Sequence, residues 1–394
     1  MQYSSFVGVG AQKGGYQNLI YTFDGDDETL EEGRFVQVPI YHKHADRIDE
    51  SLLFFMPESK ERYYQDFMDE FHDVKVTPVD IQENISFEDF VTLLAKYMRP
   101  DGEVIVDVTH SFRQIPIRML FALKYVEFLK NIKVEHIYYG KVKNKNQLGI
   151  ICDSVQDYVY QSVTECLSQF NNTLIIRSKD WEGILENDPK VVRFLDALTD
   201  FNEMVELCEF DSSIHAIDQI LEASKSLEEE AEKYTLILPL TSSIRRKFEP
   251  VYHAQSPREK RKQVILILLA HQRYQNAVTF TDQFLREECV KAVERNGISR
   301  DSSYLYNFSQ CILERNAPTP KMLKYVERLK TNPNYPRVRG ILQQDQGTIN
   351  KFFNEIRNSM NHGTTIQGGK RKYKALEKQI RAVVRRLLEI IDQL

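Results

Sequence analysis

The chain has 394 residues, of which 42% are hydrophobic and 28% are charged, a composition typical of folded domains and not of disordered segments. This length allows two domains of ordinary size, each with its own core. A formal net charge of −5 argues against a protein that coats nucleic acid through bulk positive charge.

Targeting and redox signals point to one compartment. The first five residues lack the basic and apolar regions of a signal peptide, and no uncharged apolar run is long enough to span a bilayer. The five cysteines are odd in number and scattered, which is typical of free thiols in a reducing environment. We therefore expect a cytoplasmic protein with no membrane segment.

The first 155 residues alternate between strand and helix patterns. Strands are predicted at Ser4–Gly10, Gln17–Phe23, Phe35–Ile40, Ser51–Met56, Val74–Ile81, Glu103–Thr109, Val134–Val142 and Leu148–Cys152. Helices are predicted from Glu58 to about His72, from the N-cap Ser86 to about Met98, and at Phe112–Lys130. This alternation predicts an α/β domain with a mostly parallel, doubly wound sheet and hairpins at Gln17–Ile40 and at its end. Ligands of such sheets bind at the carboxyl ends of strands, here the loops after Val9 and Val108.

From about Ser154 onward the patterns are almost entirely helical. Helices are predicted around Tyr158–Phe170 and at Val191–Glu209, Ile214–Lys233, Lys262–Asn296, Ser303–Glu314, Thr319–Leu329, Thr348–Asn361 and Lys370–Leu394, with an exposed loop at Thr331–Gly347. We predict three parts: an α/β domain at 1–155, a helical linking region at 156–235 and an all-α domain at 236–394.

A polar turn follows the strand that starts at Glu103. It reads Asp107-Val108-Thr109-His110-Ser111-Phe112-Arg113, and it opens a helix whose free N–H groups and dipole favour phosphate. We expect ligand contacts from Thr109, His110, Ser111 and Arg113, and from Gly10, Ala11, Gln12 and Lys13 on the neighbouring strand end. The alternative is a well-capped helix beside a glycine turn. The glycines do not form the dinucleotide pattern G-x-G-x-x-G, which disfavours a nicotinamide-dependent enzyme.

A second motif lies near the C-terminus, at Arg357-Asn358-Ser359-Met360-Asn361-His362. An arginine that binds phosphate and a histidine that moves a proton would suffice to cut RNA without a metal. We expect Asn358 and Asn361 to position the 2′-hydroxyl or the histidine. Five helical steps turn ~500°, so Arg357 and His362 would point ~140° apart on a straight helix. Either His362 lies at the end of the helix before Gly363, or two chains share a site.

Other features near this motif leave choices open. Residues 351–394 carry ten Lys or Arg against four Asp or Glu, and residues 245–262 carry seven against two. This charge suits an RNA site, but it also fits ordinary solvated helix faces. Four polar residues interrupt a predicted apolar helix: His271, Tyr274, Asn276 and Asp282. Packing is the ordinary role of such residues, although one of them could face the cleavage site.

Both motifs resemble signatures of known families. Asp107 to Arg113 resembles the Asp-x-Thr-His-Gly-Phe-Arg signature of CARF sensor domains, with Ser111 in place of the glycine. Arg357 to His362 resembles the Arg-x4-His signature of HEPN ribonucleases. In this order the two motifs resemble the CARF–HEPN accessory ribonucleases of type III CRISPR systems over nearly the whole chain.

The resemblance implies an antiviral endoribonuclease that cleaves single-stranded RNA without a metal or other cofactor. A cyclic oligoadenylate would activate it at the interface of a homodimer or higher oligomer; we expect a ring of four adenylates, with six as the alternative. Two other functions stay open. The chain could be a sensor without catalytic activity that regulates a partner, or its CARF domain could also degrade the cyclic ligand.

Overall fold

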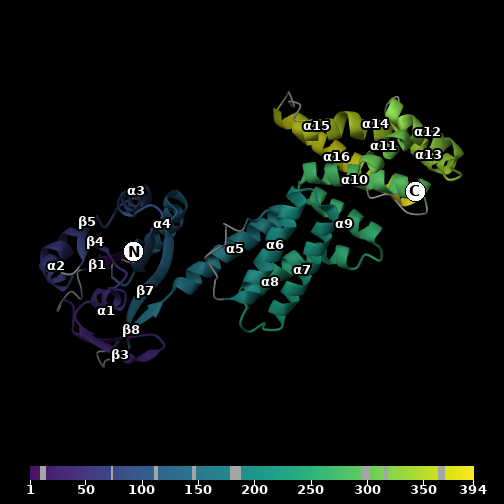
Figure 1. The fold of residues 1–394 in the computed structure, drawn as a ribbon. Coiled ribbons are helices and arrows are strands. Elements are labelled where there is room, and N and C mark those ends of the chain that lie inside the picture. The colour runs from purple at the N-terminus through teal and green to yellow at the C-terminus, as the bar shows by residue number, and fades with distance from the viewer. Residues whose placement is uncertain are drawn as a thin grey trace. The chain divides into compact units, whose positions relative to one another are not determined.

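Figure 1 shows a computed structural model of the chain, which forms two compact units at residues 1–160 and 161–394. The structure describes residues 1–8, 15–71, 74–110, 114–143, 148–177, 188–294, 302–314, 318–362 and 369–394. The second unit includes both the predicted linking region from residue 161 onward and the predicted all-α domain.

The first unit is built on one sheet of eight strands in the order β3-β2-β8-β7-β6-β1-β4-β5. Its strands are β1 (Gln2–Val7), β2 (Leu19–Phe23), β3 (Asp26–Gly33), β4 (Glu50–Phe55), β5 (Lys75–Asp80), β6 (Glu103–Asp107), β7 (Lys133–Lys143) and β8 (Leu148–Asp153). The five strands from β7 to β5 are mutually parallel, and hairpins β2–β3 and β7–β8 complete the sheet. The predicted α/β domain with a mostly parallel sheet is confirmed.

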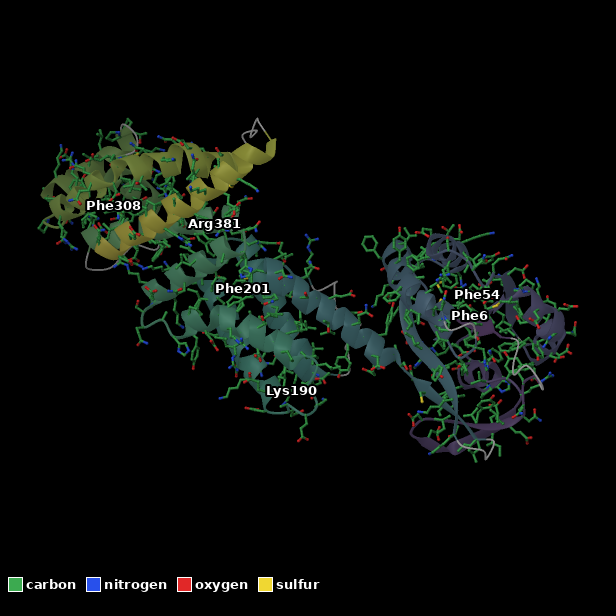
Figure 2. All side chains as sticks on the ribbon, turned by 180° about the vertical axis from the view of Figure 1, so that it is seen from behind. Phe6, Phe54, Lys190, Phe201, Phe308 and Arg381 are labelled. Atoms are coloured by element: carbon green, nitrogen blue, oxygen red, sulfur yellow. The ribbon has the colours of Figure 1, made fainter. Side chains whose placement is uncertain are left out.

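Helices cover both faces of this sheet: α1 (Gln37–Lys43), α2 (Pro57–Glu70), α3 (Phe87–Tyr97) and α4 (Gln114–Lys130). Phe6 and Phe54 face α3 and α4, with ring centroids 5.2 Å apart (Figure 2). Tyr3 and Phe55 lie on the opposite face, toward α1 and α2. Because side chains alternate along a strand and both faces are covered, β1 and β4 are buried at every position, and their polar residues such as Ser4, Ser5 and Ser51 are buried with the apolar ones. Ser86 caps α3 as predicted, because its Oγ accepts from Asp89 N at 3.0 Å.

One predicted strand of this unit is wrong. The partner of β2 is the acidic segment Asp26–Gly33, and Phe35–Ile40 leads into helix α1. An acidic strand is tolerated because β3 lies at the edge of the sheet. Phe35 to Ile40 is buried against α2 and the sheet, and a short apolar run does not distinguish a buried strand from a buried helix.

Helix α5 (Val155–Thr173) runs from the first unit into the second, and the rest of the described chain is helical, as predicted. The helices are α6 (Pro189–Glu206), α7 (Phe210–Glu228), α8 (Leu238–Tyr252), α9 (Pro257–Ala270), α10 (Tyr274–Val293), α11 (Ser302–Ile312), η3 (Pro320–Met322), α12 (Leu323–Thr331), α13 (Tyr335–Gln344), α14 (Gln346–Lys351), η4 (Phe352–Arg357), α15 (Asn358–His362) and α16 (Gly369–Gln393). Phe201 and Phe308 are buried in this unit (Figure 2). None of the described helices combines the length and apolar character needed to cross a membrane.

Three helical boundaries differ from the prediction. The predicted helix Lys262–Asn296 is divided into α9 and α10, with Gln272 at a φ of 61° between them. Helix α8 was not predicted; its Pro239 lies in the first turn, where proline is tolerated, whereas Pro250 lies inside the helix. The predicted loop Thr331–Gly347 contains helix α13.

Gly149 permits the close contact of β8 with β2. A Cβ at this position would lie 2.6 Å from Cε1 of the buried Tyr21. We predict that Gly149→Ala destabilises the first unit by about 1–3 kcal/mol through overpacking. Gly340→Ala in α13 is the control, because a Cβ there meets nothing within 4 Å and alanine favours a helix by up to about 1 kcal/mol. Urea unfolding of both variants checks this, and equal destabilisation would contradict it.

Candidate functional site

The first candidate site lies at β1, where the order of the strands in the sheet reverses. Strand β1 pairs with β4 on one side and with β6 on the other, all in parallel, so the chain leaves the carboxyl ends of β1 and β6 side by side. Such a switch point is the usual ligand site of a doubly wound sheet. The loop after β1 and the turn after β6 are the two segments that the sequence analysis selected.

Asp107 at the end of β6 holds the turn together. Its carboxylate is fully buried and accepts from Ser5 Oγ at 2.7 Å on β1 and from Thr109 N at 2.9 Å. The Thr109 hydroxyl also donates to it, and burial raises the pKa of the Asp107 carboxyl. Thr109 Oγ1 in turn accepts from Gly140 N at 2.7 Å on β7. Because the hydroxyl proton goes to Asp107, the Thr109 side chain positions the turn, and its contact with a ligand stays a prediction.

His110 lies directly beside the end of β1. A Cβ on Gly8 would lie 3.5 Å from His110 Cβ, so the two segments are almost in contact. The rings of His110 and Tyr16 meet edge to face, with centroids 4.9 Å apart at 85°, and Tyr16 OH donates to Gly8 O at 3.1 Å. Burial lowers the pKa of His110 to about 4, so the imidazole is neutral near pH 7. The other predicted ligand contacts lie outside the described residues: Gly10, Ala11, Gln12, Lys13, Ser111 and Arg113.

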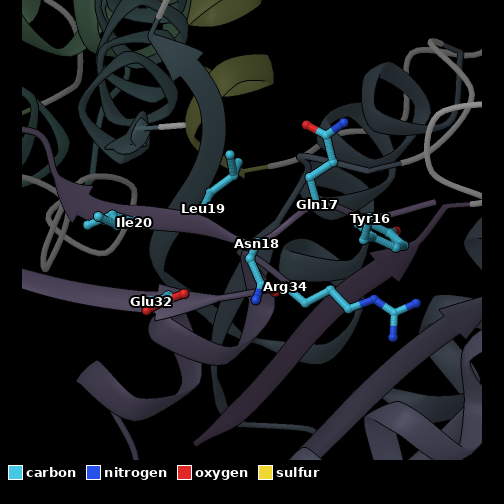
Figure 3. A pocket seen from close by; sticks show the side chains of 7 residues that line it. All are labelled: Tyr16, Gln17, Asn18, Leu19, Ile20, Glu32 and Arg34. Carbon is cyan, nitrogen blue, oxygen red and sulfur yellow. The ribbon is translucent and has the colours of Figure 1, made fainter. Parts of the chain in front are cut away.

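A hollow of about 710 Å³ opens next to Tyr16 (Figure 3). It is lined by Tyr16, Gln17, Asn18, Leu19, Ile20, Glu32 and Arg34. The Arg34 guanidinium lies over the rings of Phe35 and Tyr63, at 5.2 and 5.3 Å, and Tyr16 meets the same two rings edge-on. An aromatic cluster therefore connects this hollow with the His110 turn. The sequence pattern does not indicate these residues, because their convergence depends on the position of the β2–β3 hairpin.

The second candidate site contains Arg357. Its Nε donates to Asp282 Oδ2 at 2.8 Å, and the other oxygen of Asp282 accepts from Arg286 Nε at 2.6 Å. Asp282 is 8% exposed, whereas the Arg357 side chain is 24% exposed. The bond uses Nε and leaves the two terminal nitrogens of the Arg357 guanidinium for other partners. Of the four polar residues on the apolar helix, Asp282 is the one that meets the motif.

Arg286 anchors this carboxylate from inside the second unit. It is 4% exposed, donates to Ser309 Oγ at 3.1 Å and lies over the rings of Tyr306 and Phe353, at 4.9 and 5.1 Å. Two guanidinium groups thus share one carboxylate, and the cluster keeps a net positive charge. Arg286 is fixed in the core, while Arg357 reaches the surface. This arrangement suits the binding of an anion at Arg357.

The backbone around Arg357 departs from a regular α-helix. Phe352–Arg357 (η4) forms a π-helical turn, which is uncommon and frequently marks functional sites. Its residues Phe352, Phe353 and Ile356 are fully buried and fix the turn. Helix α15 (Asn358–His362) follows, and whether His362 lies at a helix end stays a prediction, because residues 363–368 lie outside the described part of the chain. Asn358 is half-buried, and the side chains of Asn361 and His362 lie outside the described part of the structure.

The remaining polar candidates serve packing within the second unit. Arg381 Nη2 donates to Tyr274 OH at 2.7 Å, and His271 Nδ1 lies 3.1 Å from Asn172 O. Asn276 Nδ2 donates to Val205 O at 2.8 Å. In the basic stretch 245–262, five cations pair with acidic side chains: Arg245 with Glu228, Arg258 with Glu288, Lys260 with Asp218, Arg261 with Asp211 and Lys262 with Asp392. Among the described residues, no group of three His, Cys, Asp or Glu side chains is placed to hold a metal ion.

Because His110 is neutral in the folded chain, the free energy of unfolding depends on pH. Its folded pKa of about 4 lies below the ordinary value of 6.5, so the unfolded chain takes up a proton first as the pH falls. Stability is therefore lost between about pH 6.5 and pH 4, by about 2 kcal/mol at pH 5. Hydrogen exchange of β6 should show this loss, and His110→Asn should reduce it. An unchanged pH dependence in His110→Asn would contradict the assignment.

Because Arg286 and Arg357 share the Asp282 carboxylate, we predict that Asp282→Ala and Arg357→Ala lower the free energy of unfolding by different amounts. Asp282→Ala leaves the buried Arg286 without its counterion and should destabilise the second unit by about 3–5 kcal/mol. Arg357→Ala leaves the Asp282–Arg286 pair intact at a partly exposed position and should cost about 1 kcal/mol. Urea unfolding followed by the helical circular dichroism signal measures both; equal costs would be inconsistent with this division.

Three comparisons place the chain among known proteins. No protein-family model matches it. Over 70 residues, or 18% of this chain, it is 39% identical to a CRISPR-associated protein, MJ1674, of Methanocaldococcus jannaschii; this stretch spans 11% of that relative's length. Enterococcus italicus Csm6, solved with cyclic hexa-2′-fluoro-hexa-dAMP, aligns with 99% of this chain and 94% of that one, at 11% identity and a TM-score of 0.34. The chain is thus similar over 70 residues to a CRISPR-associated protein, and its two motifs resemble the CARF and HEPN signatures.

Proposed function

We propose that the protein is a cytoplasmic, metal-independent endoribonuclease of type III CRISPR antiviral defence, activated by a cyclic oligoadenylate. In this proposal residues 1–155 bind the activator, residues 236–394 cut single-stranded RNA, and residues 156–235 connect them. The observation that carries it is the placement of Arg357. A buried carboxylate holds this partly exposed guanidinium, five residues before His362 in the sequence.

The chemistry follows from the residue types in the motif. Arg357 would bind the scissile phosphate through its terminal nitrogens, while Asp282 holds Nε. The 2′-oxygen of the RNA loses its proton and bonds to phosphorus, and the 5′-oxygen leaves and gains a proton. His362 would transfer these protons, with Asn358 and Asn361 positioning the 2′-hydroxyl or the imidazole. The products would be a 2′,3′-cyclic phosphate and a 5′-hydroxyl.

The activator would bind at the switch point of the sheet. The turn after β6 would offer backbone N–H groups and a neutral His110 to the phosphates, together with Ser111 and Arg113. Gly10 to Lys13 would contact it from the end of β1. We propose that two copies of the chain share one ring, of four adenylates as the first choice and six as the alternative. The ring activates the enzyme only if it binds the active arrangement more tightly than the inactive one.

A fluorogenic single-stranded RNA tests the proposal with a panel of cyclic oligoadenylates in EDTA. We predict cleavage with one ring size, and a loss of at least about 100-fold in Arg357→Ala and in His362→Ala, because phosphate binding or proton transfer is removed. Arg385→Ala is the matched control, because Arg385 is an exposed arginine of the same unit. Arg113→Ala should raise the activator concentration needed.

Two outcomes would contradict this function. Activity that disappears in EDTA and returns with Mg²⁺ would exclude the metal-free mechanism. An absence of RNA cleavage with every ring, despite tight binding of one of them, would favour a catalytically silent sensor. Degradation of the ring by the CARF domain is the other candidate, favoured by the neutral His110 imidazole, which is able to accept a proton. Incubation of His362→Ala with labelled ring would detect it.

A further inference from the structure

An exposed aromatic ring lies beside the arginines of the second candidate site. Helix α11 packs against α10, and its residues Phe308 and Ser309 are fully buried (Figure 1). Tyr306 of the same helix is 49% exposed, and its ring contacts Arg286. We call Asp282, Arg286 and Arg357 the arginine cluster. A large, flat apolar surface is therefore open to solvent at the edge of this cluster.

Arg286 covers one face of the Tyr306 ring and holds the ring in place. Its guanidinium carbon lies over the ring, 4.9 Å from the centroid. Arg286 is itself fixed, because its side chain donates to Asp282 Oδ1 and to Ser309 Oγ, at 2.6 and 3.1 Å. The exposed area of Tyr306 therefore belongs mainly to the edge and the opposite face of the ring. A flat apolar group can stack there on a ring that is already positioned, which lowers the ordering cost of binding.

The Asp282 carboxylate connects this ring to the candidate phosphate site. Its Oδ2 accepts from Arg357 Nε at 2.8 Å, while its Oδ1 accepts from Arg286 Nε. Two side chains, Asp282 and Arg286, thus link the Tyr306 ring to the Arg357 guanidinium. The arginine cluster has two cations and one carboxylate, so the ring lies next to a net positive charge. Proteins bind single-stranded nucleic acid with this combination, in which cations contact the backbone and rings stack on bases.

We propose that Tyr306 stacks on an unpaired base of the RNA, next to the phosphate that Arg357 binds. The inference rests on the proposed function for the phosphate and adds a contact with the base. Every base has a flat π-face, so this contact tolerates different sequences. In a double helix each base is paired and stacked between its neighbours, so its faces are not available to Tyr306. The contact therefore selects single-stranded over double-stranded RNA.

RNA binding by full-length variants tests the contact separately from cleavage. In a His362→Ala chain, with cyclic tetra-adenylate or hexa-adenylate present, fluorescence anisotropy measures the dissociation constant of a short labelled single strand. We expect Tyr306→Ala to raise this constant by about 10-fold or more, because one stacked base is lost, and Tyr306→Phe to leave it nearly unchanged. Tyr252→Ala, at a 62% exposed tyrosine of α8, is the matched control and should have no effect. With a duplex of the same sequence, Tyr306→Ala should change the affinity little.

Tryptophan fluorescence detects the stacked base directly. The chain has one tryptophan, Trp181, so Tyr306→Trp adds a single new indole, and the chain with Tyr306 gives the background signal. Single-stranded RNA should quench the new indole, because a base stacks on it. The same strand without the base beside the scissile phosphate should quench it much less.

Several results would overturn the base contact: no binding of the single strand by the His362→Ala chain with either ring, an unchanged affinity in Tyr306→Ala, an equal loss of affinity in Tyr306→Phe, or an indole that RNA does not quench. The proposed function fails in a different way. Binding that depends on Tyr306, in a chain that does not cleave RNA although His362 is intact, would overturn the ribonuclease activity and leave the base contact standing.

Discussion

The first unit depends on the buried carboxylate of Asp107, which ties together three strands. It accepts from Ser5 on β1 and from Thr109 in the turn after β6, and Thr109 accepts from Gly140 on β7. A buried carboxylate is stable only when such donors satisfy it. The strand ends and the turn are therefore fixed relative to each other before any ligand arrives. Preorganisation of this kind lowers the ordering cost of binding.

In the second unit, too, a buried carboxylate holds a candidate site residue in place, here through charged donors. Asp282 lies between the buried Arg286 and the partly exposed Arg357, and each arginine donates to a different oxygen. The two cations offset part of the desolvation cost of the carboxylate, and Arg357 gains a fixed position. A surface arginine without this contact would lose side-chain entropy on binding phosphate. Arg357 is the last residue of the π-helical turn Phe352–Arg357, and its Nε donates to Asp282 on α10.

The sequence predicted the elements whose pattern is local. The strand β6, the N-cap Ser86 and the amphipathic helix at the C-terminus follow from apolar spacing and capping chemistry, and the structure contains all three. Phe35–Ile40 was assigned to the wrong class, because burial on one side produces the same letters in a short strand and a short helix. The break between α9 and α10 places Gln272 in the left-handed backbone region, and the sequence has no glycine there to indicate it. The bond between Asp282 and Arg357 joins residues 75 positions apart, and only tertiary packing reveals it.

The two outer strands of the sheet restrict how copies of the chain can associate. Strand β3 carries Asp26, Glu31 and Glu32, and β5 at the other edge contains Lys75 and Pro78. Repulsion between acidic side chains opposes strand addition at one edge, and a proline without an N–H opposes it at the other. Both edges thus resist the continuous growth of a shared sheet, which is the route to fibrous aggregates. Strand pairing between copies at either edge of this sheet is thereby disfavoured.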